Sequence, residues 1–247
     1  MYQFEICANS VESCLAAQEG GAHRVELCAG ISEGGTTPSY GEIATARELL
    51  KSKLHVIICP RGGDFLYTGQ EIEIMEKDIQ MAHQLGVDGV VFGCLTHEAK
   101  IDIAQNQRLI KAAKGLSVTF HRAFDKCINP LEALEQLISL GVDRILTSGQ
   151  RPTALEGLPL LKDLVCMAGD RIVILPGSGI NENNIRQIAM ESRAREFHFS
   201  TRENRNSNMT HRSTLVSMNS AGMPDEYMQS VTTTQRVRET INALESI

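Results

Sequence analysis

Short apolar runs alternate with longer amphipathic segments along most of this chain. The runs have the length of strands, and strands that alternate with helices are typical of a parallel sheet. The predicted strands are Phe4–Cys7, Arg24–Cys28, Leu54–Cys59, Gly89–Gly93, Leu116–His121, Arg144–Thr147, Arg171–Leu175 and Glu196–Phe199. Helices are predicted near residues 10–20, 40–51, 70–85, 104–114, 130–140, 155–168 and 182–191, with a last one over Thr234–Leu244.

Strand–helix units of this size and number predict a (β/α)8 TIM barrel of the α/β class. The alternative is an open, doubly wound sheet, which usually carries a glycine-rich turn after its first strand. Here Cys7-Ala8-Asn9-Ser10 ends and follows that strand, so the pattern favours the barrel. No change in composition marks a second domain, and we expect residues 1–247 to form a single TIM-barrel domain.

One segment, about residues 202–233, interrupts this pattern. It is rich in Asn, Ser, Thr and Met and shows little periodicity, so we expect an irregular stretch before the C-terminal helix. Long irregular segments in compact domains are usually functional or disordered. The segment leaves the eighth strand at the end of the barrel where active sites lie. Three interpretations stay open: a lid, a subunit contact or a disordered loop.

Strand alternation sorts the side chains of each strand into two sets. Large apolar residues such as Phe4, Val25 and Phe197 share one parity and should face the helices, which leaves the other parity for the barrel interior. The inward set should meet at the carboxyl ends of the strands, where barrel enzymes keep their active sites. Its candidate catalytic members are Glu5, Glu26, Arg61, His121 and His198. The alternative is a self-satisfied polar layer in which Glu26 pairs with Arg61.

Two loops beside the predicted site combine an arginine with an aspartate. The loop Pro60-Arg61-Gly62-Gly63-Asp64-Phe65 follows the third strand, and Arg122 and Asp125 follow the fifth. An arginine fork suits a carboxylate or a phosphate group. We therefore add Asp64, Arg122 and Asp125 to the candidate catalytic residues, with each aspartate orienting the arginine near it.

The loops after the sixth, seventh and eighth strands are candidates for an anion site. Barrels commonly bind phosphate there, at backbone amides and small polar residues. The candidate ligand-binding residues are Ser148, Gly177, Ser178, Gly179 and Ser200. The alternative is that the glycines only make tight turns.

Composition and charge narrow the range of partners. The net charge of −6, from 24 basic and 30 acidic residues, argues against a nucleic-acid partner, which would favour a basic surface. Neither a secretory leader nor a run of about 18 apolar residues is present, so we expect a cytoplasmic protein without a membrane partner. A homo-oligomer is compatible with these features.

The seven cysteines are widely spaced and form no Cys-x-x-Cys motif, which favours free thiols over disulfides or a zinc knuckle. Cys7 and Cys28 share the inward parity on neighbouring strands, and Cys59 has that parity on the third strand. Thiolates and thioethers select Cu(I), so Cys7 and Cys28 are candidate metal ligands. The alternative is that they are buried structural thiols. The late segment adds thioethers at Met209, Met218, Met223 and Met228.

Several longer motifs occur in order along the chain. They are Arg24-Val25-Glu26-Leu27-Cys28, Gly34-Gly35-Thr36-Thr37-Pro38-Ser39, Pro60-Arg61-Gly62-Gly63-Asp64-Phe65, Thr119-Phe120-His121-Arg122-Ala123-Phe124-Asp125, Leu146-Thr147-Ser148-Gly149-Gln150, Ser217-Met218 and Asp225-Glu226-Tyr227. In these motifs the chain resembles the CutC family over nearly its whole length. The resemblance implies a cytosolic TIM barrel associated with copper homeostasis, in which cysteines bind Cu(I).

Two functional hypotheses follow. The first is a copper homeostasis protein that binds copper near Cys7 and Cys28. The second is an acid/base or metal-assisted enzyme acting on a small anionic substrate, for example a phosphorylated one. In the second hypothesis Arg61 and the loops after the seventh and eighth strands hold the anion. Glu26, His121 and His198 would then transfer protons or bind a metal ion.

Overall fold

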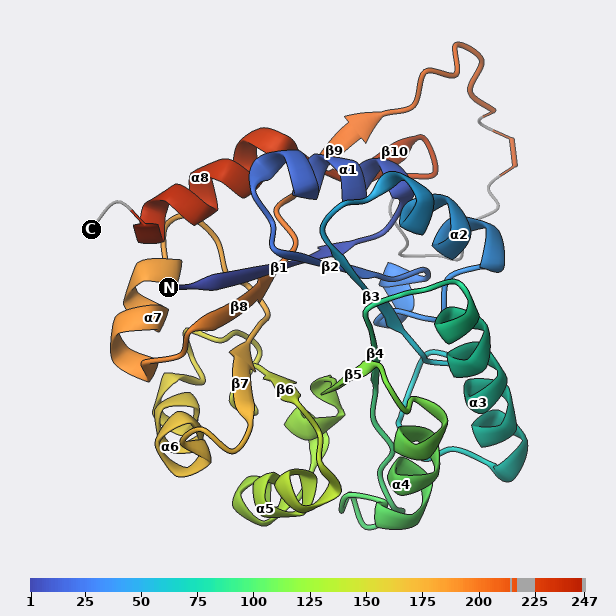
Figure 1. Ribbon diagram of the computed structural model, residues 1–247. Helices are drawn as coiled ribbons and strands as arrows, with labels where there is room; N and C mark the ends of the chain where they lie inside the picture. The colour runs from blue at the N-terminus through green and yellow to red at the C-terminus, as the bar shows by residue number, and fades with distance from the viewer. Residues whose placement is uncertain (214, 217–224, 246–247) are drawn as a thin grey trace.

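Eight parallel strands close into a barrel in the computed structural model, which describes residues 1–213, 215–216 and 225–245. The strands are β1 Gln3–Ala8, β2 Arg24–Leu27, β3 Lys53–Ile57, β4 Gly89–Phe92, β5 Ser117–Phe120, β6 Arg144–Thr147, β7 Val173–Pro176 and β8 Glu196–Phe199. Neighbouring strands follow the chain order, and β8 pairs with β1. A bridge between Gly177 and His198 joins the end of β7 to β8. The predicted TIM barrel is confirmed (Figure 1).

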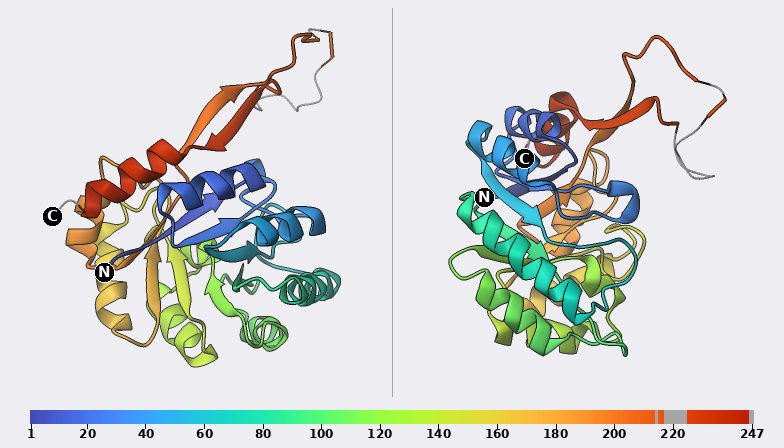
Figure 2. Two further views of the ribbon diagram at one scale, coloured as in Figure 1. Left: turned by 45° about the horizontal axis from the view of Figure 1, so that its top comes forward. Right: turned by 90° about the vertical axis from the view of Figure 1, so that its right-hand side faces the viewer.

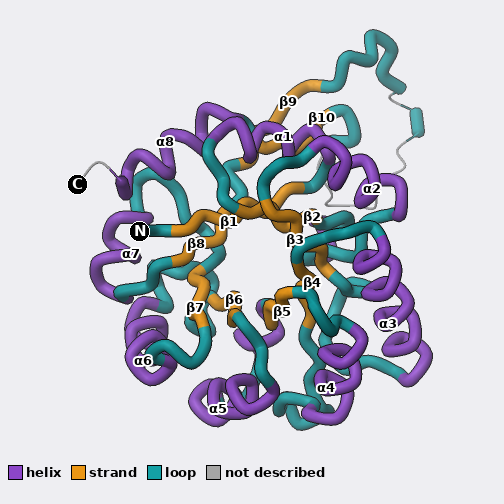
Figure 3. Tube along the Cα trace, in the orientation of Figure 1, coloured by secondary structure: helices purple, strands orange, loops and turns teal. Residues whose placement is uncertain are grey.

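The helices form a ring outside the strands (Figure 3). They are α1 Val11–Gly20, α2 Tyr40–Leu49, α3 Gly69–Gln84, α4 Ile103–Ala112, α5 Pro130–Leu140, α6 Leu158–Ala168, α7 Ile185–Ser192 and α8 Thr234–Glu245. Local chemistry explains where several begin. Ser39 and Glu42 form a reciprocal capping box at α2, and Thr68 and Glu71 form another at α3. Pro130 is the first residue of α5, where its missing N–H costs nothing.

Apolar and polar side chains separate across the barrel wall as the strand alternation predicts. Phe4 and Phe197 belong to the apolar core between the strands and the helices. Glu5 and His198, of the opposite parity, are buried inside the barrel. The polar interior surrounded by an apolar outer core is what positions the site. Among the described residues, no helix has the length and apolarity that crossing a bilayer requires.

Several boundaries differ from the predicted ones. The third strand ends at Ile57 rather than Cys59, because the Cys59 backbone N–H donates to Thr37 Oγ1 in the loop. Helix α6 begins at Leu158 and α7 at Ile185, each after a turn that precedes it. Two loops contain short 3-10 helices, η1 Ile31–Glu33 and η2 Arg122–Lys126.

The prediction of an irregular segment over residues 202–233 is wrong at both of its ends. Strands β9 Arg202–Asn206 and β10 Met228–Thr232 pair antiparallel into a ribbon that projects from the barrel (Figure 2). Both strands are mostly polar and lie far apart in the sequence, so no local alternation of apolar residues reveals them.

Side-chain contacts attach the base of this ribbon to the barrel. Arg205 of β9 binds Glu12 of α1 through two nitrogens, and Asn9 donates to the Ser230 carbonyl of β10. The ribbon therefore has a defined place beside the first strand–helix unit. Three predicted motif or thioether residues, Ser217, Met218 and Met223, lie outside the described residues.

Candidate functional site

A cavity of about 400 Å³ lies at the carboxyl ends of the strands. Thiols, carboxylates, imidazoles and arginines line it: Cys7, Glu26, Cys28, Glu33, Cys59, Arg61, His121, Arg122, His198 and Arg202. Most of the predicted inward residues are thus brought together. The volume falls in the range of pockets for small organic molecules and exceeds what a single ion needs.

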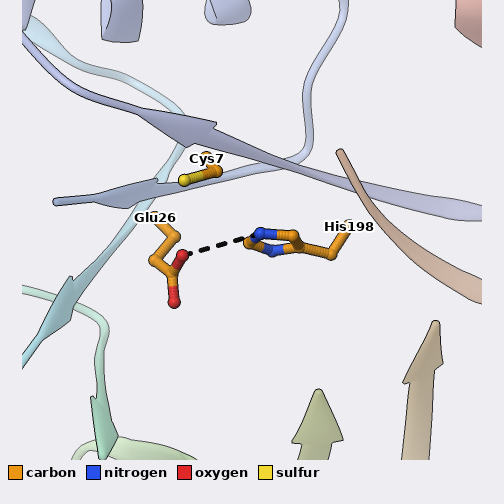
Figure 4. Close-up of side chains that lie close together, drawn as sticks. All are labelled: Cys7, Glu26 and His198. Atoms are coloured by element: carbon orange, nitrogen blue, oxygen red, sulfur yellow. Dashed lines mark ion pairs between the residues drawn. The ribbon is translucent and has the colours of Figure 1, made fainter. Parts of the chain in front are cut away.

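Cys7, Glu26 and His198 point toward one another in this cavity (Figure 4). One potential ligand atom from each lies within 4.8 Å of the others. His198 Nε2 is 3.7 Å from Glu26 Oε2, and its Nδ1 is 2.7 Å from Glu5 Oε1. Cys28 adds a second thiol, with its Sγ 3.8 Å from Cys7 Sγ and 3.3 Å from Glu26 Oε2. These side chains meet because β1 lies between β2 and β8 in the closed barrel.

The contacts within this cluster shift the charges of its members. The Cys28 thiol, supported by His198, holds the pKa of Cys7 well below its usual range. The hydrogen bond between the two thiols, together with burial, raises the pKa of Cys28 well above its usual range. Burial, with repulsion from Cys7 and Glu5, raises the pKa of Glu26 to about 8. Burial opposes a charge on His198, but Glu26, Cys7 and Glu5 more than offset it and raise its pKa. These shifts favour the thiolate form of Cys7, the imidazolium form of His198 and the neutral form of Glu26.

Glu5 lies behind His198 in the barrel interior and does not line the cavity. It is fully buried and binds Arg24, which also donates to Glu196 at 2.8 Å. Glu196 in turn accepts from Arg144 at 2.9 Å. Burial opposes the charge on Glu5, but Arg24 and His198 hold its pKa well below the usual range. Glu5 therefore supports His198 from a buried ionic layer in which two carboxylates face two arginines.

His121 lines the cavity from the end of β5 and packs against Phe65, with ring centroids 4.7 Å apart. Its Nδ1 accepts the backbone N–H of Ala123 at the start of η2. Within the described part of the chain, its buried Nε2 has no hydrogen-bond partner. Burial lowers the pKa of His121 to about 4. The ring is therefore neutral near pH 7 and carries its proton on Nε2.

Arg61 also lines the cavity, but its guanidinium is occupied by its own loop and by α3. A guanidinium has five N–H donors, and here five bonds use them. The acceptors are Glu71 Oε1, Asp64 Oδ1 and the carbonyls of Gly62, Asp64 and Leu66. Glu26 contacts the thiol–imidazole cluster instead, so the alternative in which Glu26 pairs with Arg61 is wrong. An anion could bind Arg61 only by replacing one of these bonds.

Asp125 organises the rim between β5 and β6. Its carboxylate accepts hydrogen bonds from Thr147 Oγ1, from the backbone N–H groups of Ser148 and Gln150, and from Ser148 Oγ. Arg122 donates to Asp125 Oδ2 at 2.7 Å and to Ser148 Oγ at 2.9 Å. Asp125 is thus a loop-organising group, and the arginine near it is bound by it, as the sequence led us to expect.

The predicted anion-binding residues fall into two groups: those that line the cavity are Ser178, Gly179 and Ser200, and those that do not are Ser148 and Gly177. A Cβ at Gly177 would lie 2.5 Å from Leu146 Cδ1 and 3.3 Å from His198 Cδ2. Glycine at this position therefore permits close packing. The Ser178 hydroxyl donates to the Pro152 carbonyl, which leaves its oxygen free only as an acceptor.

Arg202 is a cavity residue that the sequence analysis missed, because it lies in the segment expected to be irregular. Its positive charge adds to the effects of Cys28 and His198 that lower the pKa of Cys7. Arg24 and Glu196 of the ionic layer were not among the candidate site residues. The alternation that directs Glu26 and His198 inward directs these two residues inward as well, so it could have found them.

The donor set of the cluster suits a thiophilic metal ion. Cu(I) prefers sulfur ligands and also accepts imidazole, and two thiols and one imidazole are close together here. Among the residues described, Glu26 Oε1 is a buried oxygen without a hydrogen-bond partner. Cys59 is engaged elsewhere, because its Sγ donates to the Arg61 carbonyl and lies 3.4 Å from Tyr67 Oη. The fit therefore rests on Cys7, Cys28 and His198.

The fold and the site together define a TIM barrel whose mouth is lined by thiols, a carboxyl group and imidazoles. The CutC family profile matches residues 2–203, which is most of the chain. The family protein CutC of Bacteroides thetaiotaomicron is 62% identical over 99% of both chains. The copper homeostasis protein cutC homolog of Homo sapiens is 47% identical over 98% of this chain and 89% of its own. This chain belongs to the CutC family.

Solved structures agree with this assignment. CutC from Streptococcus agalactiae is 36% identical, with a TM-score of 0.78 over 81% of this chain and 99% of its own. Thiamine phosphate pyrophosphorylase from Pyrococcus furiosus gives a TM-score of 0.61 at 17% identity, over 99% of this chain and 96% of its own. The second likeness is one of fold alone.

Proposed function

We propose that this protein acts in copper homeostasis by binding Cu(I) at the Cys7–Cys28 thiol pair. The observation that carries the proposal is the 3.8 Å separation of the two sulfurs beside the His198 imidazole. The family relation supports a role in copper handling. Cys7 is only partly buried and lines the cavity, so a metal ion can reach it from solvent.

The state of the thiols fits this proposal. The lowered pKa of Cys7 favours its thiolate, which is the form that binds metal ions, and Cys28 would release its proton on binding. All seven cysteines are free. Free thiols suit a reducing compartment, so we extend the proposal to a protein that works in the cytoplasm.

An anaerobic Cu(I) titration against a competing chelator tests the proposal. The wild type should show a tight site, and the Cys7→Ser/Cys28→Ser double variant should lose it. Cys166→Ser is the matched control, because Cys166 is an exposed free thiol and does not line the cavity. An unchanged titration in the double variant would rule out the thiol pair as the copper site.

A second candidate function is acid/base catalysis on a small anionic molecule, and the cavity volume favours it. A space of about 400 Å³ is of the size used for small organic ligands. The raised pKa of Glu26, about 8, lies near physiological pH, where a carboxyl group can both donate and accept a proton. His121 would act as a neutral hydrogen-bond donor beside it.

Incubation with a panel of phosphorylated and carboxylated metabolites, followed by mass spectrometry, tests this second candidate. The wild type should consume a compound that Glu26→Gln, which cannot transfer the carboxyl proton, leaves intact. Equal consumption by both proteins, or no consumption by either, counts against catalysis at this site.

A further inference from the structure

Arg202 places an unpaired positive charge in the wall of the cavity. Its Nη1 is buried and has no hydrogen-bond partner among the residues that the structure describes. No described carboxylate lies within ion-pair distance of it. The other two arginines in the lining differ, since Arg61 is bound to Glu71 and Arg122 to Asp125. Arg202 is half-buried, but a buried guanidinium nitrogen is normally hydrogen-bonded, so the lack of a partner at Nη1 among the described residues points to a ligand.

The base of the β9–β10 ribbon holds Arg202 at this position. Arg202 pairs in register with Thr232, the last residue of β10. Thr232 is fixed in turn, because its N–H donates to Ser13 Oγ and its hydroxyl donates to the Ser200 carbonyl. Contacts to α1, to β10 and to the end of β8 therefore position the backbone of Arg202. Because the backbone is already held, ligand binding would cost less conformational entropy.

The corner between β8 and β9 is strained at the residue before Arg202. Thr201 has a φ of 45°, in the left-handed region that a β-branched residue rarely adopts. Its hydroxyl oxygen is also buried and, within the described part of the chain, has no hydrogen-bond partner. Such strained conformations are concentrated at binding and catalytic sites. Here the corner turns the chain so that both Ser200 and Arg202 line the cavity.

Among the described residues, the ion pairs around the cavity include Arg61, Arg122 and His198 but not Arg202. His198 has carboxyl groups on both sides, with its Nδ1 2.7 Å from Glu5 Oε1 and its Nε2 3.7 Å from Glu26 Oε2. Glu33, the other carboxylate in the lining, is exposed to solvent. An incoming anion would therefore meet a guanidinium that forms no ion pair with a described carboxylate, although the chain as a whole is acidic.

We propose that Arg202 binds the carboxylate or phosphate group of a small organic ligand, whose remainder extends toward Cys7, Glu26 and His198. The planar fork of a guanidinium suits both oxyanions, which it binds through two parallel hydrogen bonds. This inference goes beyond copper binding and does not require it. It deepens the second candidate function, on which it rests for the role of the ligand, by moving the anion anchor from Arg61 to Arg202.

Isothermal titration calorimetry at low ionic strength tests the anchor with three probes: inorganic phosphate, glycerol 3-phosphate and succinate. The wild type should bind a phosphate or a carboxylate probe saturably, and the preferred probe assigns the oxyanion. Arg202→Gln should weaken that binding at least about tenfold, because it removes a charged hydrogen-bonding partner. Arg202→Lys should fall between the two. The matched control is Arg205→Gln on the same ribbon, whose arginine pairs with Glu12 and does not line the cavity.

Two results of the comparison between the wild type and Arg202→Gln would overturn the anchor. One is equal affinity of the wild type and Arg202→Gln for the bound probe. The other is a lack of saturable binding of all three probes to the wild type up to about 10 mM, which is weaker than specific recognition.

The Cu(I) titration, repeated on Arg202→Gln, separates the proposals. Retained copper with lost anion binding supports the anchor, whereas loss of anion binding in Arg205→Gln as well contradicts a specific role for Arg202. If the wild type and Arg202→Gln consume a substrate equally well, the catalytic function is retained and the proposal that Arg202 anchors the anion is refuted.

Discussion

Replacement of Glu5 by glutamine should destabilise the protein by about 3 kcal/mol. Glu5 is fully buried and bound to both Arg24 and His198. Removal of one partner from a buried ion pair costs about 3–5 kcal/mol, because the other charge loses its compensation. Arg24 keeps Glu196, so we expect the lower end of this range. In a chain of this length each kcal/mol lowers the Tm by about 2–4 °C, which gives a decrease of about 6–12 °C.

Thermal and urea unfolding at pH 7 measure this change, and Glu12→Gln is the matched control. Glu12 also binds an arginine, Arg205, through two hydrogen bonds, but both side chains are exposed. Exposed ion pairs contribute little, so the control should keep its Tm within about 2 °C of the wild type. The reasoning fails if the two variants lose the same stability.

The pH dependence of Glu5→Gln gives a second check. The folded-state pKa of Glu5 is depressed by Arg24 and His198. The carboxylate therefore stabilises the fold fully above its unfolded pKa of about 4.3, and this contribution disappears as the pH falls through the folded value. The difference between wild type and Glu5→Gln should narrow as the pH is lowered below about 4. A difference that stays constant down to the acid limit of the fold would refute an ionic role.

Two other variants test the electrostatics of the cavity and its rim. The pKa of Glu26 rises to about 8 on folding, so the wild type loses stability as the pH rises from about 4.3 toward 8, and Glu26→Gln should gain stability relative to it over that range. Urea unfolding at pH 5 and pH 8 measures this, and an equal difference at both pH values contradicts it. Asp125→Asn should cost about 2–3 kcal/mol, because a charged acceptor of several hydrogen bonds is lost. Thermal unfolding measures this loss of stability, and amide hydrogen exchange at Ser148 and Gln150 should become faster. Unchanged exchange at these two residues argues against a loop-organising role of Asp125.

Much of the candidate site could be predicted from alternation along the strands. The apolar parity of Phe4 and Phe197 directs Glu5 and His198 to the opposite side, and the structure has both inside the barrel. The closed strand order then makes β1 the neighbour of both β2 and β8. That closure is what places Cys7 between Glu26 and His198, and it follows from the number of strand–helix units.

Alternation could not predict which groups would be partners. Arg61 shares the inward parity, yet its five donors turn back to its own loop and to Glu71 because acceptors there lie closer than Glu26. Glu5 shares the parity of Glu26 but lies behind His198 and pairs with Arg24. The parity of a residue in a strand specifies the face on which its side chain lies. The partner of that side chain and its depth in the barrel depend on the stagger of the strands and on side-chain length.

The sequence by itself determined the barrel, the inward set of polar residues and the family, because these depend on local periodicity and on the order of motifs. The tertiary structure added three facts: Cys7 lies beside His198, the donors of Arg61 are already bonded, and Arg202 Nη1 has no hydrogen-bond partner among the described residues. The ribbon that carries Arg202 pairs β9 with β10, which lie far apart in the sequence and show no apolar alternation. Such a pairing leaves no local trace, since its contacts exist only after the chain has folded.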